Sequence, residues 1–198
     1  MTTLEQLAAE AGSCTRCDLY QRATATVFGA GRAGAPLALV GEQPGDQEDK
    51  QGQPFVGPAG GLLDRALADS GISRADAYVT NAVKHFKWVA RGKRRIHQRP
   101  NGTEIAACRG WLEAELAVVG PRVAVALGAV AGEALFGRGF RVRDHRGQLE
   151  DAAVGEWHGA VVSTIHPSAI LRAPDGAARD EAYSGLVADL VTVRKALG

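Results

Sequence analysis

The distribution of hydrophobic residues along this 198-residue chain predicts alternating strands and helices. Four short apolar runs suit strands that are buried on both faces of a sheet, and apolar residues at helical spacing lie between them. A capping box at Thr2-Thr3 opens a short helix that ends at Gly12. We therefore expect an α/β fold, a single domain over residues 1–198 with a central, mostly parallel four-stranded sheet and helices on both faces. The expected strands are 37–40, 78–83, 123–127 and 160–165, with a weaker candidate at 146–150, and the later helices are 61–70, 103–119, 129–136 and 179–197.

Composition narrows the class of protein only slightly. Apolar residues make up 45% of the chain, enough for a packed core, and the net charge of +1 implies no global field. The first ten residues carry acidic side chains and no apolar run, and no stretch approaches the roughly eighteen apolar residues of a membrane span. We expect a cytoplasmic monomer with no membrane partner, whose three cysteines serve in metal binding, catalysis or plain burial rather than in disulfides.

The most polar loop follows the first expected strand. Residues 41–60 hold four carboxylates, one aromatic ring and five glycines, between the apolar run 37–40 and the helical pattern that begins at 61. Ligands of open α/β sheets bind at the carboxyl ends of the strands. We therefore expect a functional site in this loop.

A basic segment, which we expect to be a loop at residues 85–103, follows the second strand. From 77 to 103 there is no acidic residue, and Lys84, Arg95 and five other cations are interleaved with two aromatic rings. Cations for phosphate and rings for stacking are typical of nucleic-acid contact, although a solvated loop would also carry charge. The segment ends at His97, whose ring the flanking cations should keep neutral and nucleophilic, although a lone loop histidine is more often a surface residue.

Metal-ligand spacing occurs in the C-x-x-C pair of Cys14 and Cys17, within the N-terminal segment 1–30. Cys108 lies in the helix after the basic segment, and His85 at the exit of the second strand is the candidate fourth ligand. Thiolate-bound metals take four ligands, but spacing alone does not separate zinc from an iron–sulfur cluster. Reduced, buried thiols are the simpler alternative.

Four separated motifs, in order, resemble the uracil-DNA glycosylase superfamily over nearly the whole chain. They are Gly-Glu-Gln-Pro-Gly at 41–45, Gly-Gln-Pro-Phe-Val-Gly at 52–57, Thr-Asn at 80–81 and His-Pro-Ser at 166–168, and they are similar to the family 4 enzymes. Two departures, a histidine in place of a cysteine at 85 and the Lys-Arg-Arg-Ile-His insertion at 93–97, resemble the branch called UdgX, whose loop histidine becomes bonded to the DNA sugar. The resemblance implies a 4Fe-4S iron–sulfur cluster held by Cys14, Cys17, His85 and Cys108.

The same resemblance implies that three residues are catalytic. Glu42 would lie beside the sugar cation, His166 would face uracil O2, and His97 would bond to the sugar carbon. Phe55 is expected to stack on the flipped base and the Asn81 amide to match uracil O4 and N3–H, so that cytosine would be mispaired at about 1–3 kcal/mol per group. The other expected substrate contacts are Gln43, Asp46, Lys84, Arg95 and Ser168. Asp46 could instead orient the loop or simply be solvated. For Asn81 the alternative is a turn residue at the strand end, and for Ser168 it is a plain helix N-cap.

We expect an enzyme that excises uracil from uracil-containing DNA, with single strands as the expected form, and that ends in one covalent adduct per molecule through His97. The first alternative is a conventional family 4 glycosylase in which Glu42 activates water and His97 only contacts phosphate. The second alternative is a non-catalytic, metal-containing protein that binds nucleic acid.

Overall fold

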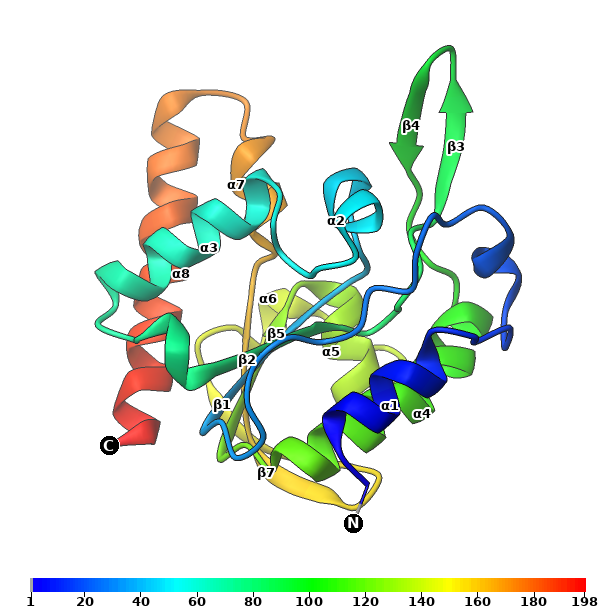
Figure 1. Ribbon diagram of the computed structural model, residues 1–198. Coiled ribbons are helices and arrows are strands. Elements are labelled where there is room, and N and C mark those ends of the chain that lie inside the picture. Colours follow the sequence, from blue (N-terminus) through cyan, green and yellow to red (C-terminus); the bar gives the residue numbers. More distant parts are fainter. Residues whose placement is uncertain (1) are drawn as a thin grey trace.

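The computed structural model describes residues 2–198 and contains a five-stranded sheet between two helical layers (Figure 1). The strand order is β2-β1-β5-β7-β6, in which β6 pairs antiparallel with β7 and the other pairs are parallel. Four parallel neighbours place their carboxyl ends at one edge of the sheet. The strands are β1 (Leu37–Gly41), β2 (Ala77–Asn81), β5 (Val123–Leu127), β6 (Leu149–Val154) and β7 (Trp157–Thr164).

Alternation along the central strands divides the core into two clusters. In β1, Leu37 and Leu39 face one layer, whereas Ala38 and Val40 face the other. Both sets are fully buried, because helices cover both faces of the sheet. The first layer contains α3 (Pro58–Asp69), α7 (Pro167–Leu171) and α8 (Gly176–Leu197), and the second contains α1 (Leu4–Ala11), α4 (Gly102–Val119) and α5 (Ala129–Phe136).

The predicted α/β fold with a mostly parallel sheet and helices on both faces is confirmed, but the sheet has five strands rather than four. The weak candidate at 146–150 only overlaps the start of β6, which runs over Leu149–Val154. This strand is at the sheet edge, and its residues alternate between exposed and partly buried up to Val154, which is buried. It therefore lacks the continuous apolar run that identified the central strands.

The expectation of a loop over residues 85–103 is wrong in part, because the segment contains an antiparallel hairpin. Strand β3 (Trp88–Arg91) pairs with β4 (Arg94–His97), and the two-residue turn between them places Gly92 at φ 58°. Positive φ at the first turn residue is typical of tight hairpins. The hairpin projects from the body of the molecule above the strand ends (Figure 1).

Short elements complete the structure. A six-residue helix, α2 (Asp46–Gln51), lies within the polar loop after β1, and α6 (Val142–His145) precedes β6. Two 3-10 turns, η1 (Asp18–Gln21) and η2 (Arg74–Asp76), lie before β1 and β2 respectively. Among the described residues, no helix combines the length and hydrophobicity that crossing a membrane requires.

Candidate active site

A cavity of about 300 Å³ opens where the parallel strands end. The loop after β1, the last residue of β2, the end of β4 and the turn after β7 all contribute to its walls. The structure thus brings together the three residues predicted to be catalytic, from positions far apart in the sequence. The lining residues are Glu42, Gln43, Gly45, Glu48, Phe55, Ala59, Asn81, His97, His166, Ser168 and Arg172.

One of the four loop carboxylates holds the loop itself together. The backbone N–H of Gly45 donates to Glu48 Oε2 (3.1 Å), and the N–H of Gly57 donates to Glu48 Oε1 (2.8 Å). Glu48 therefore ties the two ends of the segment that contains α2. Both oxygens are engaged by backbone donors, so this carboxylate is a structural group although it lines the cavity.

Two further carboxylates fasten the hairpin to the loop. Arg95 on β4 donates from Nε to Asp46 Oδ1 (2.5 Å) and from Nη1 to Asp49 Oδ2 (2.6 Å). Its guanidinium also lies 5.3 Å from the Phe86 ring centroid and 5.4 Å from that of Trp88. Asp46 and Arg95 were expected to contact substrate, but neither lines the cavity, and here they hold the hairpin against α2.

The fourth carboxylate, Glu42, faces His97 across the cavity wall. Nε2 of His97 lies 3.1 Å from Glu42 Oε1, and the two side chains are 51% and 23% exposed. No described donor points at Glu42 Oε1 in hydrogen-bonding geometry, although this oxygen is buried. A buried carboxylate oxygen without a directed donor is able to interact with a positive charge that develops in the cavity.

His166 has a defined proton position. It accepts the backbone N–H of Ser168 at Nδ1 (3.1 Å), and the Ser168 hydroxyl lies 2.8 Å from the same atom. Nδ1 is therefore an acceptor, so the neutral ring carries its proton on Nε2. Burial lowers the pKa of His166 to about 4, despite the opposing effect of Glu42. The side chain is a neutral N–H donor at physiological pH.

Phe55 and Asn81 form a flat wall and a polar end of the cavity. The Phe55 ring centroid lies 6.2 Å from that of His166, with 30° between the planes. Phe55 has φ 57°, an unusual conformation for a non-glycine residue, and a Cβ on Gly60 would lie 1.7 Å from its carbonyl oxygen. A Cβ on Gly41 would lie 2.3 Å from Asn81 Oδ1 and 2.6 Å from Phe55 Cζ. Only glycine fits at these two positions.

Two other predicted substrate residues are occupied by contacts within the protein. Gln43 donates from Nε2 to the carbonyls of Lys87 (3.2 Å) and Gln98 (3.1 Å) and accepts the N–H of Lys87 (3.1 Å), so its amide fastens the base of the hairpin. Lys84 is completely buried and forms an ion pair with Glu115. The prediction that Lys84 contacts DNA is wrong, because its ammonium group faces the core.

The three thiols gather around the start of α4. Cys14 and Cys17 pack against the core cluster that contains Cys108. The indole N–H of Trp111 donates to Cys14 Sγ (3.2 Å), and the backbone N–H of Lys84 donates to Cys108 Sγ (3.2 Å). Burial raises the pKa of Cys108 to about 11, so a metal would have to displace its proton.

The fourth predicted ligand, His85, is buried, and its Nε2 lies 2.9 Å from the Thr26 hydroxyl. Only Nδ1 would then be available to a metal. Within residues 2–198, no three or more His, Cys, Asp or Glu side chains are arranged to hold a single metal ion. The donor set of three sulfurs and one imidazole, with N–H groups directed at two of the sulfurs, fits iron–sulfur ligation in its chemistry.

Sequence reasoning missed two charged residues of the cavity wall, Glu48 and Arg172. The sequence does not distinguish Glu48 from the other loop carboxylates, because its role arises only when folding of α2 brings it to the backbone N–H groups of Gly45 and Gly57. Arg172 follows α7 and is exposed at the cavity, and within residues 2–198 it has no carboxylate partner. Its position six residues after His166 is a signal that the sequence did contain.

Comparison with known proteins identifies related sequences over most of the chain. Residues 28–191 match the family model described as the uracil DNA glycosylase superfamily. A type-4 uracil-DNA glycosylase of Thermotoga maritima is 39% identical over 160 residues, which cover 80% of this chain and 78% of that protein. Type-4 uracil-DNA glycosylases of Pyrobaculum aerophilum and Archaeoglobus fulgidus are each 32% identical, over 82% and 88% of this chain and 81% and 86% of theirs.

Proposed function

Because this chain belongs to the uracil-DNA glycosylase superfamily and is a glycosylase, we propose that its cavity is the site at which uracil is excised from DNA. The observation that carries the proposal is the convergence of Glu42, Asn81 and His166, with the Phe55 ring, on one cavity at the carboxyl edge of the sheet. These groups supply base recognition and stabilisation of both charges of the reaction.

Base recognition would use Phe55 and Asn81. A glycosylase takes the base out of the helical stack before reaction, and the exposed face of the base then needs an aromatic or apolar partner. The Asn81 amide offers one donor direction and one acceptor direction, which match O4 and N3–H of uracil. Cytosine presents the opposite polarity at position 4, so it would leave a buried amide group mispaired.

Bond cleavage would use His166 and Glu42. When the bond between the sugar carbon and the base nitrogen breaks, its electron pair leaves with uracil and the sugar becomes an oxocarbenium-like cation. The Nε2–H of His166 would donate to the uracil oxygen that gains negative charge. Glu42, whose Oε1 has no directed donor, would stabilise the sugar cation.

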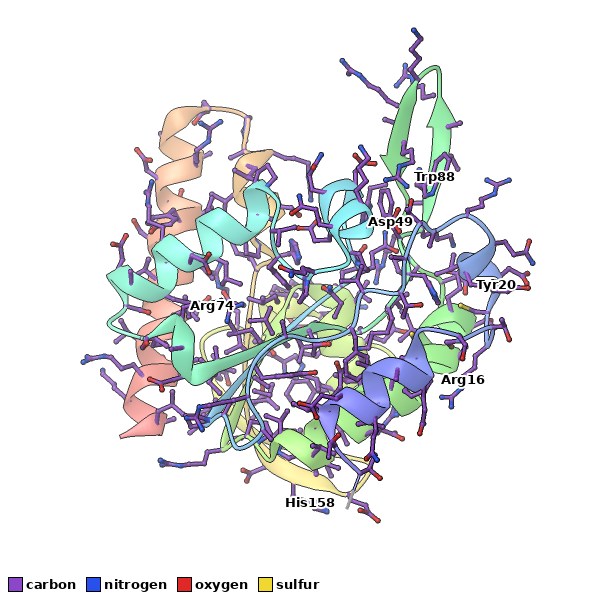
Figure 2. All side chains as sticks on the ribbon, viewed as in Figure 1. Arg16, Tyr20, Asp49, Arg74, Trp88 and His158 are labelled. Atoms are coloured by element: carbon purple, nitrogen blue, oxygen red, sulfur yellow. The ribbon has the colours of Figure 1, made fainter. Side chains whose placement is uncertain are left out.

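DNA contact would use the cations that the fold leaves unpaired. Lys84, Lys87 and Arg95 are each paired with carboxylates. Within residues 2–198, Arg91, Lys93 and Arg94 at the hairpin tip and Arg172 beside the cavity have no such partner. Figure 2 shows nitrogen-tipped side chains reaching into solvent from the hairpin tip, above the labelled Asp49 and Trp88. A DNA strand that crosses the cavity would find phosphate partners on both sides of the flipped nucleotide.

We also propose that Cys14, Cys17, His85 and Cys108 hold a 4Fe-4S cluster. Support comes from the shared location of the thiols and from the two N–H···S contacts. The cluster would join the N-terminal segment to the residues after β2 and to α4, and the excision steps above do not need it to change its redox state. A preference for single-stranded DNA, the monomeric state and the cytoplasmic location stay predictions.

Two routes are available for the last step. In the first, water attacks the sugar cation with Glu42 as the base and the enzyme turns over. The type-4 names of the relatives support this route. In the second, the Nε2 lone pair of His97 attacks the same carbon, and the imidazolium that results releases its Nδ1 proton to solvent. The 3.1 Å contact between His97 and Glu42 favours the second route, because a group beside Glu42 is also beside the carbon that Glu42 stabilises.

An assay with uracil-containing oligonucleotide in large excess over protein tests both parts of the proposal. Free uracil must appear, and its release must fall strongly in Asn81→Ala and His166→Ala. Uracil equal to the amount of protein would indicate the histidine route, whereas many equivalents would indicate the water route. Release of no uracil by the wild-type protein would contradict the proposed function.

A further inference from the structure

A buried polar network lies directly behind Asn81. Lys84 Nζ donates to Thr80 Oγ1 (2.7 Å), to the Asn81 carbonyl oxygen (2.7 Å) and to Glu115 Oε2. An ammonium group has three donors, so all of them are used inside the protein. Lys84 and Glu115 are both fully buried. No donor of this lysine is left for DNA, and the group instead caps the end of the strand that carries the base-recognition residue.

Glu115 on α4 is equally saturated. Its Oε1 accepts the Tyr78 hydroxyl (2.9 Å) and the backbone N–H of Gly29 (3.0 Å), and the Thr80 hydroxyl lies 2.9 and 3.0 Å from its two oxygens. Burial raises the pKa of Tyr78, so this hydroxyl remains a donor. The network therefore holds Thr80 and Asn81, the last two residues of β2, from the side of α4. On the adjacent strand, Gly41 lies close to the Asn81 side chain and restricts where it can move.

We propose that the Lys84–Glu115 pair is a positioning element for Asn81 and so contributes to uracil recognition. A buried ion pair is weak as a source of stability, since desolvation offsets much of the attraction. The position of this ion pair behind Asn81 indicates a role in positioning rather than in stability. The ammonium holds the carbonyl of Asn81, and displacement of that peptide would move the amide that reads the base. This inference rests on the proposed function and adds two residues that do not touch the substrate.

The test is a double-mutant cycle with Asn81. We expect Lys84→Met combined with Glu115→Gln, which retains acceptors for Tyr78 and Gly29, to lower single-turnover uracil excision by about tenfold or more. In the Asn81→Ala background the same two substitutions are expected to lower the single-turnover rate of excision by less than about twofold, because the positioned amide is absent. Inhibition by free uracil should weaken in the double variant as well.

Val193→Ala is the matched stability control. Val193 is fully buried on α8, whose C-terminal end lies at the opposite end of the molecule from α7 and the hairpin (Figure 1). It should lower the melting temperature without weakening inhibition by uracil. If the double variant does not fold, Thr80→Val replaces it in the double-mutant cycle, because it removes the hydroxyl that contacts both Lys84 and Glu115. Equal losses of rate with and without Asn81, while the wild type excises uracil, would overturn this inference alone, and an inactive wild type would overturn it together with the proposed function.

Discussion

His97 Nε2 lies 3.1 Å from Glu42 Oε1, although the two residues are at the end of a hairpin and in the loop after β1. The contact depends on the fastening of the hairpin at two places. Gln43 holds the backbone at 87 and 98, and Arg95 bridges to Asp46 and Asp49. The histidine is thus held at the cavity by the fold before substrate binds.

Glu42 and Glu48 both line the cavity, but substitution of Glu42 should affect the excision rate and substitution of Glu48 the stability of the fold. Glu42→Gln removes the charge that stabilises the sugar cation, so we expect excision to slow by about 10²- to 10³-fold. Its stability should change little, since Glu42 Oε1 has no directed donor. Glu48→Ala removes the acceptor of Gly45 and Gly57 and should cost about 1–3 kcal/mol of unfolding free energy. Single-turnover kinetics and urea unfolding measure the two effects, and a fast Glu42→Gln enzyme would contradict the assignment.

Arg95 and Arg94 are neighbours on β4 with different roles. Arg95→Met should release the hairpin from α2, raise hydrogen exchange at residues 88–97 and abolish the proposed His97 adduct while excision continues. Arg94→Met is the matched control, because Arg94 is exposed and has no carboxylate partner in the described chain. It should weaken DNA binding and its salt dependence only. Unchanged hydrogen exchange in Arg95→Met would show that other contacts hold the hairpin.

His166 should make the protein sensitive to acid. Its folded pKa of about 4 is below the ordinary value of 6.5, so the unfolded chain takes up the proton first as the pH falls. Stability is therefore expected to decrease from about pH 6.5 to about pH 4 and then to level with respect to this group. Thermal unfolding of wild type and His166→Asn across this range measures the difference. A difference in stability that does not vary with pH would contradict the neutral buried ring.

The proposed cluster makes a prediction that is independent of DNA. Purified protein should contain iron and acid-labile sulfide and show the visible absorption of thiolate-bound iron, and Cys108→Ser should lose both. Removal of iron with a chelator should lower the melting temperature, since the ligands come from the N-terminal segment, the residues after β2 and α4. Zinc without sulfide would contradict the cluster.

The central sheet and the cavity motifs were predictable because they are local signals. The apolar runs identified the parallel strands, and the polar loop at 41–60 followed one of them. The four carboxylates of that loop were not separable by sequence. Their roles depend on partners that folding brings together. Asp49, for example, binds Arg95, which is 46 residues away in the sequence.

The hairpin and the buried position of Lys84 were not predicted, because both lie in a segment rich in cations. The hairpin was missed because four cations interrupt its apolar residues between 88 and 97, although Val89 and Ile96 are paired across it. Lys84 was assigned to DNA for the same reason, whereas its partner Glu115 lies 31 residues away on a helix. A lysine in a basic segment is expected at the surface unless the position of a buried carboxylate is known.

Denaturing gel electrophoresis of the protein with a uracil-containing oligonucleotide tests the role of His97 most directly. We predict a protein–DNA band that survives heat and detergent for the wild type, no such band for His97→Ser, and continued uracil release by that variant. Mass spectrometry should then place the DNA sugar on the peptide that contains His97. Free abasic product in excess over wild-type protein, or a stable band in His97→Ser, would contradict the account.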